Sequence, residues 1–165
     1  MHDQDLEQSA PVLLTAAGHA RLKAELHFLT TDKRKEIAER IRESKDHGEF
    51  SEDNNELDEV KQEQAIIESR ILELKTILSG ADILDPKEIP TDQIGLGSKV
   101  CVVDEDRGFD FEVRLVASIE ANPDEDTISE ESPLGQSLMG LKVGGVAEFD
   151  GPAGRMRYTV KKISA

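Results

Sequence analysis

The most regular hydrophobic pattern in the chain runs through residues 57–78. Successive positions follow one another there at alternating steps of three and four residues: Leu57, Val60, Gln64, Ile67, Ile71, Leu74 and Leu78. Such spacing is a heptad seam, typical of a coiled coil, with one polar position at Gln64. Gly80 ends the pattern. The seam therefore predicts a long helix whose apolar side packs against a second helix.

A second helical pattern precedes it, from Ala16 to about Lys45, and contains no proline. Thr15 is suited to be its N-cap, because its hydroxyl can accept a hydrogen bond from an unpaired amide of the first turn. The apolar positions recur at helical spacing: Leu22, Leu26, Leu29, Ile37 and Ile41. The pattern breaks at His47-Gly48. Two such helices joined by a short loop predict an antiparallel hairpin, and an arm of about 30 residues would reach roughly 45 Å.

The remainder of the chain has a different composition. Turn-forming residues predict a linker over 81–97, and β-branched and aromatic residues are then frequent. Partial alternation predicts strands of a small antiparallel sheet at 99–103, 109–117, 146–149 and 156–163. Ser132-Pro133 predicts the start of a short helix, with proline at its first position. The expected fold class is thus α+β, divided into a flexible N-terminus (1–13), a hairpin (14–80) with its tip at 46–56, the linker, and a second domain (98–165).

Composition and charge narrow the possible partners. The 165 residues are 37% hydrophobic and 33% charged and include no Trp, which fits long exposed helices better than one large core. The formal net charge is −15. Free duplex DNA and anionic membranes would be repelled at long range, so neither is an expected partner. A protein surface with basic clefts, or a metal ion, is the more natural counterpart.

Cysteine content and hydropathy indicate the compartment. Cys101 is the single cysteine, so neither an internal disulfide nor a zinc cluster can form. Residues 1–10 are polar and acidic, without the apolar run of a signal peptide. No stretch approaches the roughly 20 apolar residues that a membrane-spanning helix needs. We therefore expect a cytoplasmic protein.

The predicted tip of the hairpin is strongly acidic. Residues 46–59 contain seven acids and neither Lys nor Arg. Carboxylates a few residues apart on a turn are good ligands for Mg²⁺, which prefers a few carboxylates plus water. Delivered to a site that already holds one metal, they could recruit a second and position an attacking water. The alternative is that these acids only solvate an exposed turn and cap the following helix.

The helix that leads to the tip is basic. Six basic side chains lie on it: Lys33, Arg34, Lys35, Arg40, Arg42 and Lys45. They could contact RNA or acidic protein walls while the tip binds metal. Alternatively they pair within the helix with Glu36, Glu39 and Glu43, which lie three or four residues away from them. Both interpretations can hold together.

Several dispersed motifs resemble one known family. They are Thr15-Ala16-Ala17-Gly18 with Leu22 and Glu25-Leu26, the run Lys61-Gln62-Glu63-Gln64 after the tip, Gly95-Leu96-Gly97-Ser98-Lys99-Val100, and Ser132-Pro133-Leu134-Gly135 with Gly140 and Gly144. In this order they resemble the GreA/GreB transcript-cleavage factors, and the tip is similar to the family's Gly-Asp-Leu-x-Glu-Asn signature. The resemblance extends from about Leu14 to Ile163.

The resemblance implies a coiled-coil arm that enters the secondary channel of bacterial RNA polymerase. There the tip acids would help to hold the second Mg²⁺, so that the polymerase hydrolyses its own backtracked RNA at the nascent 3′ end. The ion would be shared with the polymerase and absent from the free protein, which would be a cofactor of another enzyme. The second domain would be an FKBP-like α+β module that docks at the channel rim.

Functional residues are carried over by position. Glu49 matches the family's first catalytic Asp, and Glu52 its second acid, so these two are the expected Mg²⁺ ligands. Alignment from the downstream helix makes Asp53 the second acid instead. Glu131, Ser132 and Pro133 match the segment that contacts the polymerase, although Ser-Pro is also a routine helix start. Four stem residues are the expected RNA or channel contacts: Arg34, Arg40, Arg42 and Lys45.

The tip departs from the family pattern. Glu49 replaces the usual Asp, and the extra methylene moves the carboxylate by about 1.5 Å. A displacement of about 1 Å in a catalytic group can cost on the order of a hundredfold in rate. The tip also carries one extra residue, and Leu57 replaces the usual Tyr. Two alternatives follow: a channel-binding regulator that inhibits or pauses transcription without cleavage, and a coiled-coil adaptor or chaperone without a polymerase role.

Overall fold

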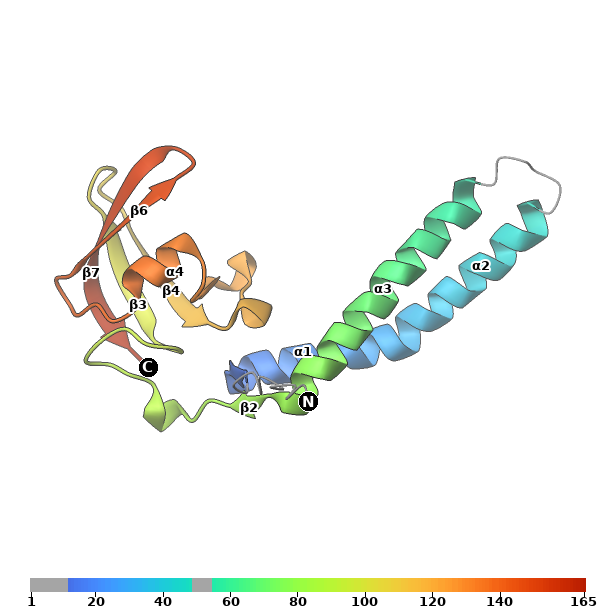
Figure 1. Ribbon diagram of the computed structural model, residues 1–165, viewed down its shortest axis with the longest axis horizontal. Coiled ribbons are helices and arrows are strands. Elements are labelled where there is room, and N and C mark those ends of the chain that lie inside the picture. Colours follow the sequence, from blue (N-terminus) through green and yellow to red (C-terminus); the bar gives the residue numbers. More distant parts are fainter. Residues whose placement is uncertain (1–11, 49–54) are drawn as a thin grey trace, which may run out of the picture. The chain divides into compact units, whose positions relative to one another are not determined.

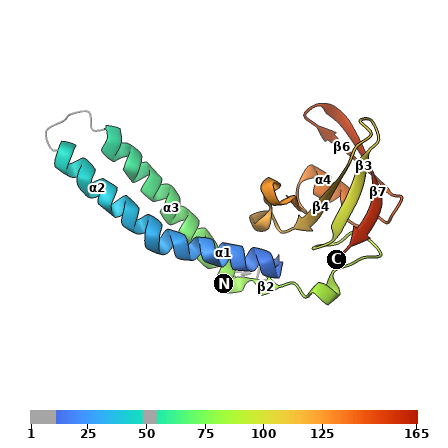
Figure 2. The same cartoon turned by 180° about the vertical axis from the view of Figure 1, so that it is seen from behind.

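A helical arm forms the first half of the chain in the computed structural model, which describes residues 12–48 and 55–165. Its elements are α1 (Ala16–Phe28), a π-helical turn η1 (Leu29–Lys33), α2 (Arg34–Gly48) and α3 (Asn55–Gly80). Figures 1 and 2 show α2 and α3 lying side by side and antiparallel. Thr15 caps α1 as predicted, since its Oγ1 accepts a hydrogen bond from the Gly18 amide at 3.0 Å.

The predicted heptad seam is the core of the arm. Val60, Ile67 and Ile71 of α3 form a buried cluster with Ile37 of α2. Leu26, Leu29 and Ile41 pack against this cluster. Gln64, the polar position of the pattern, is exposed. The hairpin inferred from spacing alone is therefore confirmed, and its two helices are held together chiefly by aliphatic contacts.

The π-helical turn interrupts what the sequence predicts as one continuous α-helix. Leu29 and Ile37 are eight residues apart, one more than a heptad. A π turn accommodates one extra residue, so both side chains stay on the side that faces α3. The hydroxyl of Thr30 donates to the Leu26 carbonyl at 2.8 Å, and that of Thr31 to the His27 carbonyl at 2.7 Å.

A five-stranded sheet forms most of the second half of the chain. Its strands are β3 (Lys99–Asp104), β4 (Asp110–Val116), β5 (Thr127–Ser129), β6 (Val146–Gly151) and β7 (Gly154–Ser164), in the order β5-β4-β3-β7-β6. The four longer strands match the predicted ones and are antiparallel neighbours. The three-residue β5 was not predicted, and it joins β4 in parallel. The α+β class is confirmed, with a mixed sheet.

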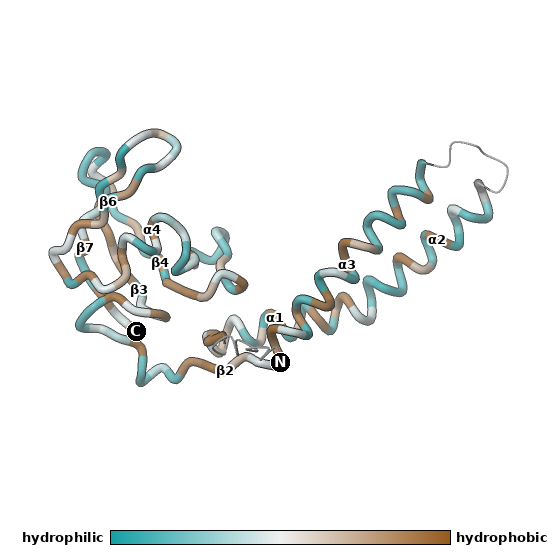
Figure 3. Tube along the Cα trace, viewed as in Figure 1, coloured by the Kyte–Doolittle hydropathy of each residue, from teal (hydrophilic) through white to brown (hydrophobic). Residues whose placement is uncertain are grey.

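The core of this sheet follows from alternation along its strands. In β3, Val100 and Val102 are fully buried, while the alternating residues Lys99, Cys101 and Val103 are partly exposed. Leu115 of β4, Val160 of β7 and Leu138 of α4 (Pro133–Leu138) complete the centre. Figure 3 shows hydrophobic stretches alternating with hydrophilic ones along these strands.

The described chain forms two compact units. One is His19–Ala81, and the other joins the residues up to Gly18 with Asp82–Ala165. In the second unit, β1 (Leu13–Leu14) pairs in parallel with β2 (Asp82–Ile83). Glu120, at the end of the 3-10 turn η3 (Ser118–Glu120), is only 3% exposed and accepts hydrogen bonds from the backbone amide and the hydroxyl of Thr15. Two further 3-10 turns are η2 (Pro86–Glu88) and η4 (Pro123–Glu125).

Candidate functional site

The end of the arm is bordered by carboxylates on both helices. Glu49, Glu52 and Asp53, the predicted catalytic and metal-binding acids, lie outside the described residues. On the near side, α2 presents an exposed Asp46. On the far side, Glu56 and Asp58 lie in the first turn of α3, where the helix dipole favours negative charge. Acidic side chains thus lie on both sides of the segment that carries the predicted metal ligands.

Two of the four predicted stem contacts are bound within the arm. Arg34 donates two hydrogen bonds to the carboxylate of Glu68 on α3, both at 2.8 Å. Arg40 donates to Glu63 of α3 at 2.7 Å. Their pKa values are raised above the ordinary range, chiefly by these hydrogen bonds. Arg34 and Arg40 therefore help to stabilise the hairpin. To contact RNA, they would have to break their ion pairs with Glu68 and Glu63.

Glu63 is the centre of a small charge cluster. It also forms an ion pair with the ammonium of Lys33 at 3.2 Å, and Lys33 in turn contacts Glu36 at 3.4 Å. The Arg40 guanidinium, and next the Lys33 ammonium, lower the pKa of the Glu63 carboxyl below its ordinary value. The predicted pairing with an acid three or four residues away is thus found for Glu36, which contacts Lys33 and Arg40. The shorter ion pairs of the same two cations are with Glu63 on α3.

Heptad positions could have identified these acids. With Gln64 and Ile71 as successive equivalent seam positions, Glu63 immediately precedes one and Glu68 lies three residues before the other. Such positions flank the seam, where cross-helix ion pairs form. Arg70 is of the same kind, and it binds Glu25 of α1 at 2.8 Å and Glu73 at 2.8 Å. A spacing of three or four residues finds partners on the same helix alone, so these cross-helix pairs were not predicted.

Arg42 and Lys45 differ from the paired cations. Both are exposed and lie on the stretch of α2 nearest the tip. Neither forms an ion pair with another residue within 12–48 or 55–165. Of the four predicted stem contacts, these two are the ones most available to RNA or to a partner protein.

The predicted docking segment is a tightly bonded corner. Ser132 is the N-cap of α4, with its Oγ accepting from the Gly135 amide at 3.0 Å and donating to the Ser129 carbonyl at 2.6 Å. Glu131 accepts from the Ser118 hydroxyl at 2.9 Å. Pro133 is exposed at the first helical position. Glu131, Ser132 and Pro133 thus form one hydrogen-bonded corner that contains the start of α4 and has Glu131 and Pro133 exposed.

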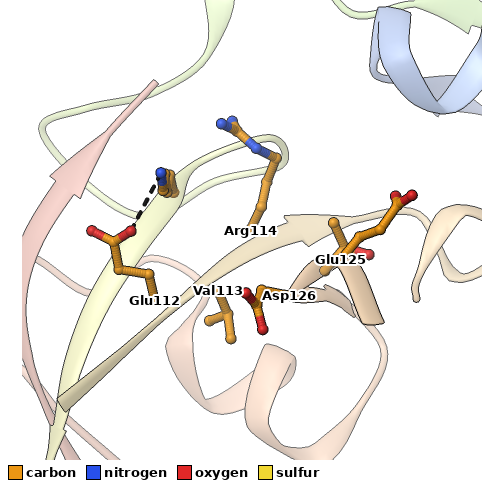
Figure 4. A pocket seen from close by; sticks show the side chains of 7 residues that line it. Glu112, Val113, Arg114, Glu125 and Asp126 are labelled. Atoms are coloured by element: carbon orange, nitrogen blue, oxygen red, sulfur yellow. Dashed lines mark ion pairs between the residues drawn. The ribbon is translucent and has the colours of Figure 1, made fainter. Parts of the chain in front are cut away.

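A polar pocket of about 280 Å³ lies beside strands β3, β4 and β5 (Figure 4). Its lining residues are Lys99, Glu112, Val113, Arg114, Glu125, Asp126 and Thr127. Lys99 pairs with Glu112 at 3.3 Å, and Arg114 donates to the Gly97 carbonyl at 2.6 Å. Because both cations already have partners, the pocket offers little to an anionic ligand.

The described residues contain neither a cluster of metal-ligating side chains nor a helix suited to span a membrane. Within 12–48 and 55–165, no group of three or more His, Cys, Asp or Glu side chains is placed to hold a metal ion. In the same part of the chain, none of the helices combines the length and the apolar character that a membrane crossing requires.

Comparison with known proteins decides the family. Residues 12–83 match the profile described as "Transcription elongation factor, N-terminal", and residues 89–165 match "Transcription elongation factor, GreA/GreB, C-term". The chain belongs to the GreA/GreB family of transcription elongation factors. Both compact units are thus accounted for by the family, and the expectation drawn from the sequence motifs is confirmed.

The relatives match over almost their whole length. Transcription elongation factor GreA of Thermoanaerobacter pseudethanolicus is 43% identical over 155 residues, which cover 94% of this chain and 98% of the relative. GreA of Alkaliphilus oremlandii is 46% identical over 153 residues, covering 93% and 96%. Among solved structures, GreA factor homolog 1 (Gfh1) of Thermus thermophilus is 35% identical, with 93% of this chain and 99% of that chain covered and a TM-score of 0.43.

Proposed function

We propose that this GreA/GreB-family protein acts in the secondary channel of bacterial RNA polymerase and stimulates cleavage of backtracked nascent RNA. The observation that carries the proposal is the acidic segment at the end of a long, ion-paired hairpin in a chain that belongs to this family over both units. An arm of this length can place its tip far from its base, about 1.5 Å farther for each residue.

The tip acids are the proposed working groups. Glu49, together with Glu52 or Asp53, would present carboxylate oxygens to an Mg²⁺ ion shared with the polymerase, the ligand type that this ion prefers. The bound ion would supply stabilisation of developing negative charge and a more acidic water. Asp46 and Glu56, the described acids on either side, add to the negative potential that attracts a cation.

The remaining predicted residues have supporting roles in the proposal. Arg42 and Lys45 would contact the RNA or the channel wall, because among the four predicted stem contacts they are the two without an ion pair in the described part of the chain. Glu131, Ser132 and Pro133 would contact the rim of the channel from the exposed corner at the start of α4. The protein itself is a cofactor of the polymerase in this account, and the cytoplasm is where that partner works.

A panel of tip variants tests which acids do the work. Glu49→Ala, Glu52→Ala and Asp53→Ala are each added with Mg²⁺ to a stalled, backtracked elongation complex, and shortening of the RNA 3′ end is followed. Loss of cleavage in Glu49→Ala and in one of the other two would identify the pair of acids. Glu39→Ala is the matched control, because it removes an exposed acid of α2 away from the tip. Equal cleavage by all four variants would contradict the proposal.

A second candidate function is a channel-binding regulator that slows transcription without cleavage. The extra methylene at Glu49 and the additional tip residue favour it, because both displace carboxylates from the family's spacing. The rate of nucleotide addition on an active, non-backtracked complex distinguishes the two functions. Slowed addition with intact backtracked RNA would establish the regulator, whereas an unaffected rate with cleavage would establish the cleavage factor.

A further inference from the structure

The outer face of α3 is unusual for a helix of such a charged protein. From residue 62 to residue 79, the exposed positions at helical spacing on the side away from the seam are Gln62, Ala65, Ile66, Ser69, Leu72, Glu73, Thr76 and Ser79. Glu73 is the single charged residue among them. We refer to this set as the neutral stripe. Its two large aliphatic side chains are well exposed, Ile66 at 70% and Leu72 at 67%.

The opposite outer face of the arm shows the contrast. On α2, the exposed positions from residue 35 to residue 46 are all charged except Ala38, namely Lys35, Glu36, Glu39, Arg42, Glu43, Lys45 and Asp46. Outer positions of a soluble coiled coil are normally polar or charged, because they meet water. The two outer faces of the arm are therefore chemically different: among the described residues, that of α3 presents large aliphatic side chains in the middle of the arm, and that of α2 presents charges.

A shallow groove follows the neutral stripe. It has a volume of about 460 Å³ and is lined by Ala65, Ile66, Ser69, Arg70 and Glu73. The charges at its edge neutralise each other, because Arg70 binds Glu73 at 2.8 Å as well as Glu25. The groove therefore favours an uncharged, apolar occupant over a charged one.

We propose that the neutral stripe is the surface by which the arm contacts an uncharged, apolar segment of the polymerase channel wall. This inference rests on the proposed function, since it assigns a face of the arm to the same partner. The contact would move Ile66 and Leu72 from water into an apolar environment. This burial would stabilise the complex in proportion to the apolar area removed from water.

The size of the stripe argues against a second copy of this chain as its occupant. Eighteen residues of helix span about 27 Å and present a face roughly 10 Å wide, or on the order of 270 Å². A stable protein–protein interface buries about 800 Å² on each partner. Two copies would also repel each other, since each carries a formal net charge of −15. A face this small fits one wall of a larger interface, such as that of an arm enclosed in a channel.

The contact would also set the rotation of the arm about its axis. With aliphatic groups on the outer face of α3 and charges on that of α2, one rotation places each face against a wall of matching chemistry. The neutral stripe is thus a positioning surface, distinct from the acids at the tip.

Binding to core polymerase tests the proposal. The variant Ile66→Gln/Leu72→Gln keeps the helix intact, because both positions are exposed and Gln is a good helix former. The Kd of labelled wild type and variant is measured by fluorescence anisotropy, alongside thermal unfolding of the free proteins. We expect a Kd about tenfold higher for the variant, equivalent to 1.4 kcal/mol, with unchanged unfolding. Ile83→Gln is the matched control, since it alters an exposed aliphatic residue outside the arm, 54% exposed on β2.

The outcomes separate this inference from the function on which it rests. If wild type does not bind polymerase, the proposed function fails. If wild type binds and the double variant binds equally well, the proposed function stands and the neutral stripe is not a contact. If the variant instead changes only sedimentation of the free protein, the stripe contacts a second copy and the inference is overturned. An equal loss in Ile83→Gln would show a nonspecific effect and would also overturn it.

Discussion

Arg34 and Glu68 form a two-pronged ion pair across the arm: Arg34 Nε and Nη2 each donate to one carboxylate oxygen of Glu68, both at 2.8 Å. This fork-on-fork geometry fixes the two helices against each other along their axes as well as holding them together. The buried seam supplies cohesion without such directionality. The pair therefore contributes to the register of α2 against α3, and so to the position at which the arm ends.

Removing either partner of this pair should loosen the arm by a small, equal amount. We expect Arg34→Ala and Glu68→Ala to lower the thermal unfolding temperature similarly, and the double variant to lower it by less than the sum, because the interaction can be lost only once. The difference between the sum of the two single effects and the effect of the double variant should shrink at high salt, since both side chains are solvent-exposed. Thermal unfolding followed by circular dichroism measures this difference. Strictly additive effects would show that the pair is not coupled in solution.

The charge cluster at Glu63 should make the stability of the arm depend on pH in the acidic range. A carboxyl whose pKa is lowered in the folded state contributes stability that is present above its unfolded pKa and lost as the pH falls through the lower, folded value. For Glu63 the loss should therefore begin near its ordinary value of 4.5 and continue downward. We expect Glu63→Gln to flatten the decline of the unfolding temperature over this range. Glu39→Gln removes an exposed carboxylate elsewhere on the arm and serves as control; the same flattening in both variants would contradict the assignment.

The pairing pattern predicts a ranking among the stem cations. Arg42→Ala and Lys45→Ala should weaken RNA cleavage or polymerase binding several-fold with unchanged thermal unfolding, because neither has an ion-pair partner in the described part of the chain. Arg40→Ala should instead lower the unfolding temperature and leave cleavage and polymerase binding nearly unchanged, because it removes the nearer of the two cations that pair with Glu63. Titration of each variant against core polymerase, together with unfolding, separates the two patterns. A larger binding defect in Arg40→Ala than in Arg42→Ala would reverse the ranking.

The corner at the start of α4 should respond to loss of its cap. Ser132→Ala removes the acceptor of the Gly135 amide, a change that costs about 1 kcal/mol for a typical N-cap. We expect weaker binding to polymerase together with slightly lower stability against denaturant. Pro133→Ala, which keeps the cap and changes only an exposed ring, should weaken binding alone if this corner contacts the partner. Unchanged binding in both variants would remove the corner from the interface.

Periodicity in the sequence was sufficient to predict the arm and most of the sheet. The three- and four-residue steps through Ile67 and Ile71 can be satisfied only by a helix with a buried side, and alternation in Lys99–Asp104 only by a strand with one. The π turn at Leu29–Lys33 was not predicted, because an extra residue between two seam positions is visible only when both helices are aligned. The strand Thr127–Ser129 was missed because three residues are too few for alternation to be recognised.

The candidate site was less predictable than the fold. The six basic residues of the stem are plain in the sequence, but which of them are engaged depends on Glu63 and Glu68, which lie on another helix. The exposure of Ile66 and Leu72 likewise depends on where they lie relative to the seam on α3. The average composition of the helix does not show this position. Contacts between segments distant in sequence, such as Thr15 with Glu120, leave no local signal at all.

The most direct test of the account is RNA cleavage by the wild-type protein. A stalled, backtracked bacterial elongation complex with labelled RNA is incubated in Mg²⁺ with and without the protein, and the 3′ end is followed over time. We expect the RNA to shorten faster with the protein than without it, and this acceleration to be lost in Glu49→Ala. Intact RNA, from a protein that demonstrably binds the polymerase, would contradict it.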